Sequence, residues 1–451
     1  MSRAVRRQLL SMADTLEKAN RALKDALTRN VVNEEGVVQL LADCQDTAIY
    51  MGNKIETLYG EGTDSVARLE DFCEILYEIT QVMGIPEQRR EKLKALAGNL
   101  KQVRRTISSE VPDRLEAVFL PYKASMWDSL ESVWQAADED EDCDAYVIPI
   151  PYYDKNSDGS FREMHYEGEE YPEYVPVTHY EDYDFAERHP DMIFIHNPYD
   201  ECNYVTSVDP FFYTKNLKQF TDKLVYIPYF ILGEINPEDE NAIKGMSHFC
   251  TTPGVVNADA VIVQSEDMRK IYINELMKHT DGSAAQRKYW ENKIYGLGSP
   301  KVDKILSTRR EDLEVPGEWL KIIQKDDGSW KKIILYNTSI GSLLAQDEKM
   351  LAKMKSVFGI FKESQDEVAL LWRPHPLVKA TIESMRPRLW MDYSEIVEHY
   401  KEEGWGIYDD TADVDRAMVL SDAYYGDWSS LVYLCQKAGK PVMIQNVEIM
   451  D

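Results

Sequence analysis

The chain has 451 residues, of which 44% are hydrophobic, and it carries a formal net charge of -28 at pH 7. A chain of this length can form two or three domains with ordinary cores. So large an acidic excess disfavours a nucleic-acid-binding protein, because a phosphate backbone needs neutralisation by Lys and Arg. A small anionic ligand stays compatible with this charge, since it needs only a local pocket.

The cysteine pattern and the hydropathy favour a cytoplasmic protein. None of the six cysteines belongs to a CxxC pair, so we expect reduced thiols and no zinc site. The start of the chain lacks the apolar core of a signal peptide, and no run of about 18 apolar residues predicts a membrane span. Arg3, Arg6 and Arg7 leave open a peripheral contact with anionic lipid at the inner face of the cell membrane, against the simpler interpretation of a solvated helix start.

Residues 1 to about 135 have a helical pattern. Segments such as LLSMADTLEKANRALKDAL and VARLEDFCEILYEITQVMG place apolar residues every three or four positions among strong helix formers. We therefore expect four or five antiparallel helices. They form either a packed bundle or a module for oligomerisation or docking, and packing alone is favoured because no heptad repeat is sustained.

The acidic stretch AADEDEDCDAY (136–146) is typical of a solvated linker and predicts a domain boundary. Beyond it, near-continuous apolar strands alternate with helices, first in residues 136–305 and again, after a polar stretch, in residues 306–451. This alternation predicts parallel sheets covered on both faces. We expect an α/β protein with two Rossmann-like domains after an all-α region, and ligands in such folds bind beyond the carboxyl ends of the strands.

Histidine and arginine side chains follow two of the predicted strands. His196 in IFIHNPYD fits a general base toward an acceptor hydroxyl, or a turn histidine that hydrogen-bonds the backbone. Arg373 and His375 in LLWRPHP fit an anionic ligand, because a guanidinium offers two donors to phosphate and an imidazole donates a proton or a hydrogen bond. The alternative for this pair is a structural arginine beside a turn histidine.

Two other strand ends are open to two interpretations each. Pro300, Lys301 and Asp303 in GLGSPKVDK follow a strand at the junction between the two halves, where Lys301 either contacts phosphate or belongs to a plain interdomain hinge. Asp409 and Asp410 could bind a metal, but such residues more often cap the following helix. We favour capping, and we predict no metal site in the chain.

The stretch YYGDWSSL combines a strand end with a helix start. Gly426 permits tight backbone geometry after the strand. Asp427 or Ser429 can cap the helix, which is a routine role for these residue types. The free N–H groups of a helix start also form an anion site, to which the hydroxyls of Ser429 and Ser430 add donors.

Taken together and in order, these stretches resemble the bacterial CDP-glycerol glycerophosphotransferase family of teichoic-acid polymerases and primases. The resemblance covers residues of about 190–445. GSPKVD resembles the family's Gly-x-Pro-Arg-x-Asp turn, with Lys301 in the Arg place, and LLWRPHP resembles its Arg-x-His-Pro segment. DVDRAMVLSDAYYGDWSSLVYLCQKAGKPVMI resembles its long signature of a strand, Asp-Tyr-Ser-Ser and Lys-Pro, with Trp428 in the Tyr place.

The resemblance implies a GT-B-like fold with a cleft, a donor such as CDP-glycerol held mainly by the C-terminal half, and a polyol-phosphate or glycolipid acceptor. His375 would serve the leaving diphosphate with Arg373 beside it, and Asp427, Ser429 and Ser430 would lie near the donor phosphates. An acceptor hydroxyl would attack the phosphorus next to glycerol and release CMP, in the synthesis of a teichoic-acid-like polymer. No cofactor is required, and the use of Mg²⁺ to neutralise the diphosphate is left open.

The sequence departs from the family in three places. The Trp-His-Gly segment that supplies the family's base is absent, so His196 is a candidate by position alone. Residues 1–135 have no counterpart in the family's core. The chain ends soon after PVMIQN, where GT-B proteins often add helices, which would fit a truncated sequence. Two alternatives therefore stay open: a GT-B glycosyltransferase that uses a nucleotide sugar, and a non-catalytic scaffold with a degenerate cleft.

Overall fold

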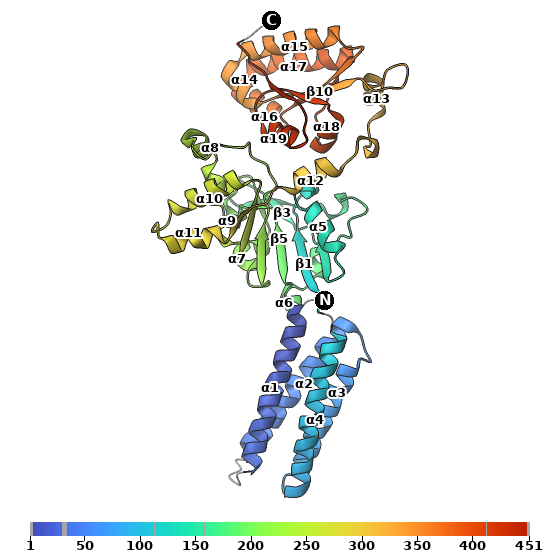
Figure 1. Ribbon diagram of the computed structural model, residues 1–451, viewed down its shortest axis with the longest axis vertical. Helices are drawn as coiled ribbons and strands as arrows, with labels where there is room; N and C mark the ends of the chain where they lie inside the picture. The colour runs from blue at the N-terminus through green and yellow to red at the C-terminus, as the bar shows by residue number, and fades with distance from the viewer. Residues whose placement is uncertain (1–2, 29–33, 112, 157, 412, 449–451) are drawn as a thin grey trace.

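The structure is a computed structural model that describes residues 3–28, 34–111, 113–156, 158–411 and 413–448. Figure 1 shows a long helical bundle, a central α/β domain and a second α/β domain at the far end from the bundle. The chain passes through these parts in sequence order, and the junction between the two α/β domains is made by α12 (Pro300–Ser307).

Four helices form the bundle: α1 (Arg3–Thr28), α2 (Glu34–Tyr59), α3 (Asp64–Gln81) and α4 (Pro86–Glu110). Buried apolar residues recur every three or four positions, and together they fill one core. Thr63 caps α3 by accepting the Val66 N–H at 3.3 Å, and Pro86 begins α4. The bundle predicted from periodicity is thus present, and its use for oligomerisation stays a prediction.

The helical region is shorter than predicted. The segment LEAVFL is strand β1 (Leu115–Leu120), which lies inside the central sheet, so the bundle ends at Glu110 rather than near residue 135. The acidic stretch 136–146 is likewise no interdomain linker, because it spans the end of α5 (Glu131–Asp138) and most of strand β2 (Cys143–Val147). A short apolar run flanked by helices does not by itself distinguish strand from helix, which explains the shifted boundary.

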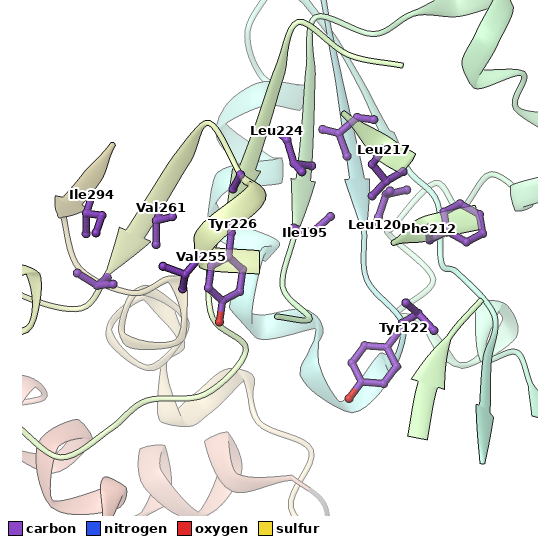
Figure 2. Packing of buried hydrophobic residues seen from close by; sticks show 14 of the residues in the cluster. Leu120, Tyr122, Ile195, Phe212, Leu217, Leu224, Tyr226, Val255, Val261 and Ile294 are labelled. Carbon is purple, nitrogen blue, oxygen red and sulfur yellow. The ribbon is translucent and has the colours of Figure 1, made fainter. Parts of the chain in front are cut away.

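The central domain is built on a six-stranded parallel sheet with the order β2-β1-β5-β7-β8-β9. Its remaining strands are β5 (Met192–Ile195), β7 (Lys223–Tyr226), β8 (Ala260–Val263) and β9 (Ile294–Gly296). A separate small antiparallel sheet has the order β4-β3-β6, with β3 (Tyr152–Lys155), β4 (Phe161–His165) and β6 (Thr206–Val208). In Figure 2 the side chains of Leu120, Ile195 and Leu224, from three neighbouring strands, belong to one apolar cluster.

The helices of the central domain after α5 are α6 (Phe185–Arg188), α7 (Thr214–Leu217), α8 (Glu240–Cys250), α9 (Pro253–Asn257), α10 (Glu266–Met277) and α11 (Ala284–Glu291). Those of the last domain are α13 (Gly317–Ile323), α14 (Ile340–Gln346), α15 (Glu348–Glu363), α16 (Val378–Met385), α17 (Pro387–Glu403), α18 (Val414–Leu420) and α19 (Ser430–Lys437).

The last domain has a five-stranded parallel sheet with the order β12-β11-β10-β13-β14. Its strands are β10 (Lys332–Thr338), β11 (Val368–Pro374), β12 (Ile407–Tyr408), β13 (Ala423–Gly426) and β14 (Val442–Ile444). The first strand, β10, lies in the middle, and the strand order reverses between β10 and β13. In doubly wound sheets that reversal opens a crevice at the carboxyl ends, where ligands bind.

The fold class is the one predicted: two Rossmann-like parallel-sheet domains in a GT-B-like pair, preceded by an all-α region. The two α/β domains meet at their loops. Tyr433 of α19 donates a hydrogen bond to the Gln264 carbonyl of the central domain at 3.3 Å. Among the described residues, no helix is both long enough and apolar enough to cross a membrane.

Candidate ligand site at the carboxyl edge of the last sheet

Three strand-end loops of the last domain come together because their strands are neighbours. Ser339 follows β10, His375 follows β11, and the Asp427–Ser430 loop follows β13, with β10 in the centre. The His375 N–H donates to the Thr338 carbonyl at 3.1 Å, and the Asp427 N–H donates to the Asn337 carbonyl at 3.0 Å. Two of the sequence-predicted motifs, 52 residues apart along the chain, thus lie on either side of one strand end.

Asp427 holds these loops together. One carboxylate oxygen accepts the Ser339 N–H at 2.6 Å, and the other accepts the Gln445 amide at 2.5 Å. The Tyr424 hydroxyl also donates to the Asp427 carbonyl. The residue is only 4% exposed, so Asp427 shapes the loops from within, and its predicted position near the donor phosphates stays a prediction.

Gly426 is required by the close approach of two strands. Its φ is +149°, and a Cβ at this position would lie 2.2 Å from the Asn337 carbonyl oxygen. The sequence prediction of tight geometry is therefore confirmed, and any side chain here would push β13 away from β10.

Helix α19 starts in this loop with two serines. The Ser429 side chain caps the helix by accepting the Leu431 N–H at 3.3 Å, while Ser430 is the exposed first residue of the helix. Trp428 precedes them and is 60% exposed. A Cβ built on Gly233 of the central domain would lie 3.3 Å from the Trp428 indole nitrogen, so the indole lies against the facing domain.

His375 is exposed on the adjoining loop. Its Nδ1 accepts the Leu377 N–H at 3.2 Å, so the neutral ring carries its proton on Nε2 and can donate from that atom. Partial burial lowers the pKa of His375, which keeps the ring neutral at pH 7. The residue also lines a hollow of about 440 Å³ that includes Lys379 and Lys401.

Arg373 has a different role from the one predicted. It is 5% exposed, and its guanidinium forms a buried ion pair with Asp409 and donates to the Thr411 carbonyl at 2.8 Å. Asp409 in turn accepts the N–H and hydroxyl of Thr411 at 3.1 and 2.7 Å. The side chain that was expected to bind phosphate is thus engaged in fixing the loop after β12, which is the structural alternative for this arginine.

His196 lies deep in the central domain and is fully buried. Its Nε2 accepts the Tyr122 N–H at 3.1 Å, and its Nδ1 lies 2.8 Å from the Ser129 hydroxyl. Burial and the nearby Lys301 charge lower the pKa of His196 to about 3. Both nitrogens are therefore occupied by the protein, which disagrees with the expected role as a general base and agrees with the turn histidine.

Helix α12 is an interdomain element. Pro300 begins it, Lys301 forms an ion pair with Asp128, and Asp303 accepts the Ser132 hydroxyl at 2.8 Å. The Lys301 side chain is only 15% exposed, so the hinge interpretation describes it and the phosphate contact does not. Lys301 and Asp303 thus bind side chains of the central domain, while α12 also packs against α18 and α19 of the last domain.

The arginines at the start of α1 are paired as well. Arg3 and Arg6 lie 3.2 and 3.3 Å from Asp113, and Arg7 lies 3.3 Å from Asp191. These contacts join the bundle to the central domain. They give the three arginines a structural role, and the peripheral lipid contact that the sequence left open stays a prediction.

Sequence reasoning missed two features of the site. The sequence analysis assigned no role to Ser339, although a serine after a buried strand and before a helix is a recognisable cap, and Ser339 caps α14 by accepting the Ser342 N–H at 3.1 Å. Trp428 was noted only as a replacement, although an exposed aromatic ring in a strand-end loop indicates a contact surface.

One group of three possible metal ligands lies within the described residues. It consists of Asp154, Glu163 and His165 on β3 and β4, and it is not part of these loops.

The fold and the three loops define a two-domain α/β protein with a GT-B-like architecture and a loop site at the carboxyl edge of its second sheet. No family model and no curated protein matches the chain.

Several solved structures are similar to the chain. A UDP-N-acetylglucosamine 2-epimerase is 12% identical over 74% of this chain and 79% of its own, with a TM-score of 0.43. The Neisseria meningitidis UDP-GlcNAc 2-epimerase bound to UDP-GlcNAc is 10% identical over 73% and 82%, at 0.41. An α,α-trehalose-phosphate synthase (UDP-forming) from Burkholderia vietnamiensis is 10% identical over 73% and 82%, at 0.36. Likenesses this low carry no conclusion about the activity of this chain.

Proposed function

We propose that the protein is a transferase that binds a nucleoside-diphosphate-activated donor at the loops around α19 and passes a group from it to an acceptor hydroxyl. The observation that carries the proposal is the convergence of three strand-end loops at the reversal of strand order, with the start of α19 and His375 among them. Backbone N–H groups at a helix start suit a diphosphate, because they donate hydrogen bonds without adding bulk.

In this proposal each side chain has a defined task. The N–H groups at the start of α19 that Ser429 does not cap, together with the Ser430 hydroxyl, donate to the diphosphate. His375 donates from Nε2 to the leaving phosphate, and it needs no proton uptake to do so. Asp427 and Gly426 act as positioning residues, since they set the spacing between the loops. Trp428 supplies an apolar surface on the side that faces the central domain.

The first donor to test is CDP-glycerol, because the motifs at Lys301, Arg373 and Asp427 resemble those of CDP-glycerol glycerophosphotransferases. The acceptor oxygen would attack the phosphorus next to glycerol, the bond from that phosphorus to the bridging oxygen would break, and CMP would leave with the electron pair. The acceptor hydroxyl would lose its proton to a base other than His196. Acceptors of the polyol-phosphate or glycolipid type, and a teichoic-acid-like product, belong to this version of the proposal.

A nucleotide sugar is the second candidate, and one observation favours it. Arg373 is buried against Asp409 and offers no positive charge to the phosphates. Attack on phosphorus builds negative charge on the transferred phosphoryl group itself, which such enzymes neutralise with cations. Transfer of a sugar places the charge on the leaving diphosphate alone, which the start of a helix can stabilise. An added Mg²⁺ ion would neutralise negative charge on the phosphates with either donor, CDP-glycerol or a nucleotide sugar.

The test is a donor comparison with the full chain. Thermal unfolding is measured with CMP, CDP, UMP, UDP and GDP, and product release is then measured with CDP-glycerol and with UDP-sugars, with and without Mg²⁺. Stabilisation by cytidine nucleotides together with CMP release supports CDP-glycerol, and stabilisation by UDP or GDP alone supports the sugar donor. Absence of stabilisation by any of the five nucleotides would overturn the proposal and favour the non-catalytic scaffold.

A further inference from the structure

The central domain carries a second cavity, of about 340 Å³, that shares no residue with the loops around α19. It lies between the small sheet, α6 and the short helix η5 (Pro210–Phe212). Figure 1 labels α6 beside the start of the bundle, at the opposite end of the central sheet from the last domain. Most of its wall is aromatic and includes Tyr153, Tyr180, Phe185, Phe211, Phe212 and Phe220.

The rings are held in mutual contact at the wall. Phe211 stacks on Phe220 with 5.5 Å between ring centres, and Phe185 lies 5.8 Å from Phe211. Tyr180 meets Phe212 edge-on at 6.2 Å. Figure 2 shows Phe212 at the margin of the central core cluster, so the inner wall is anchored in that core.

The mouth of the cavity exposes apolar surface that folding has not covered. Phe211 is 43% exposed and Met164, on β4, is 51% exposed. Exposed large apolar side chains that gather around a hollow are typical of a binding site.

The charge of the lining is negative. Twelve described residues line the cavity. Asp184 and Asp209 are the charged ones among them, and none of the twelve is Lys, Arg or His. Asp209 is fixed in place, since it accepts the Phe211 N–H at 2.9 Å and the Tyr153 hydroxyl at 3.1 Å. A neutral or anionic guest would bring these carboxylates into a drier environment without a counter-charge, which is costly.

The geometry points to an organic ammonium ion as the ligand: we propose that this cavity binds a small molecule bearing a quaternary ammonium group. Aromatic faces attract such a cation through their quadrupoles, and its methyl groups fill an apolar cavity that the carboxylates neutralise. One ring of this wall already contacts a cation, because the Arg188 guanidinium lies 4.8 Å from the centre of the Tyr183 ring, and Tyr183 lines the cavity.

The test compares a cation with its neutral counterpart. Choline and tetramethylammonium are titrated into the full chain by calorimetry, beside 3,3-dimethyl-1-butanol, in which carbon replaces the ammonium nitrogen of choline. We expect choline to bind about tenfold more tightly than the neutral alcohol, which corresponds to one cation–π interaction plus a carboxylate. Equal affinity for the two compounds, or no heat from either cation, would overturn the proposal.

Variants place the binding in this cavity. Asp209→Asn keeps an oxygen for the Phe211 N–H but removes the charge, and Phe211→Leu keeps an apolar side chain but removes the ring. Each is expected to weaken choline binding about fivefold to tenfold. Tyr204→Ala, at an aromatic position that is 93% exposed and outside the cavity, is the matched control and should bind as the parent does. Circular dichroism and thermal unfolding verify the fold of each variant, and unchanged choline affinity in both folded cavity variants would contradict the proposal.

Discussion

Lys301 of α12 forms a buried ion pair with Asp128 at the end of η1 (Ala124–Ser129), and this pair lies where the two α/β domains meet. Lys304, one turn further along α12, pairs with Glu131 at 2.9 Å. α12 also contacts the last domain, because Ile305 packs in that domain's core. The short helix therefore fixes the central domain to the last one by ion pairs and by apolar contact together.

We predict that Lys301→Gln loosens the domain arrangement. The substitution leaves Asp128 buried without its partner, next to Asp415, whose pKa is raised by burial and by Asp128. The two carboxylates would then repel each other, and the domains should separate on average. Small-angle scattering should report a larger radius of gyration at pH 8 than for the parent chain.

The control for this variant is Lys270→Gln, which removes an exposed lysine from α10 and should leave the scattering unchanged. Lowering the pH should partly restore the parent shape in Lys301→Gln. The pKa of Asp415 is raised above the ordinary Asp value of about 4, so this carboxyl takes up a proton at a higher pH than a typical Asp. Once it is protonated, it no longer repels Asp128. An unchanged radius at pH 8 would show that the ion pair does not hold the domains.

Arg373 gives a second prediction, about stability instead of binding. Because the guanidinium is buried against Asp409, Arg373→Ala should cost about 3–5 kcal/mol of unfolding free energy, the range seen when one partner of a buried pair is removed. Asp409→Ala should cost a similar amount, and the double variant should cost less than the sum. Thermal and denaturant unfolding measure these effects.

A measurement of nucleotide affinity distinguishes this structural role of Arg373 from the predicted phosphate contact. Arg373→Lys keeps a positive charge but loses the fork that contacts both Asp409 and Thr411. We expect it to unfold more easily, yet to bind a nucleotide with parental affinity below its melting temperature. A nucleotide affinity that falls more than about tenfold, which is about 1.4 kcal/mol, in a variant with parental stability would return Arg373 to the binding site.

Much of this fold could be predicted from the sequence, and the reasons are local. Ser429 is one of the two residues expected to cap a helix, and it does so by accepting the Leu431 N–H at 3.3 Å. The apolar periodicity of VARLEDFCEILYEITQVMG predicts a helix, and α3 spans Asp64–Gln81 over most of that segment. In both places the residue pattern alone determines the structure, because capping and apolar periodicity act within a few residues.

The site was harder to predict because it depends on distant partners. The segment LLWRPHP gives the same pattern whether Arg373 faces a ligand or the buried Asp409, which is 36 residues further along the chain. IFIHNPYD likewise does not reveal that the loops with Tyr122 and Ser129 enclose His196. Contacts of this kind follow from strand order, which a single sequence does not state.

His375 should affect turnover more than stability. The side chain is exposed and makes one short-range contact with the Leu377 N–H, so His375→Ala should shift the melting temperature little. If Nε2 donates to the leaving phosphate, kcat should fall about 100-fold. The control is His399→Ala, which removes another exposed histidine, from α17. A parental kcat in a folded His375→Ala protein would remove the residue from the mechanism.

The buried His196 makes the stability of the central domain depend on pH. Its pKa in the folded chain is lowered to about 3, whereas an unfolded histidine titrates near 6.5, so the unfolded state binds more protons between these values. The stability is fully present above pH 6.5 and is lost as the pH falls, by up to about 1.4 kcal/mol per pH unit. His196→Gln cannot titrate, so its unfolding free energy should change less between pH 7.5 and pH 5 than that of the parent. At pH 7.5 its unfolding free energy is lower than the parent's, because the ring contacts of His196 with Tyr122 and Tyr229 are lost. Equal pH slopes for the two proteins in denaturant unfolding would mean that His196 titrates in the folded chain as it does in the unfolded chain, which would reopen its candidacy as an acid–base group.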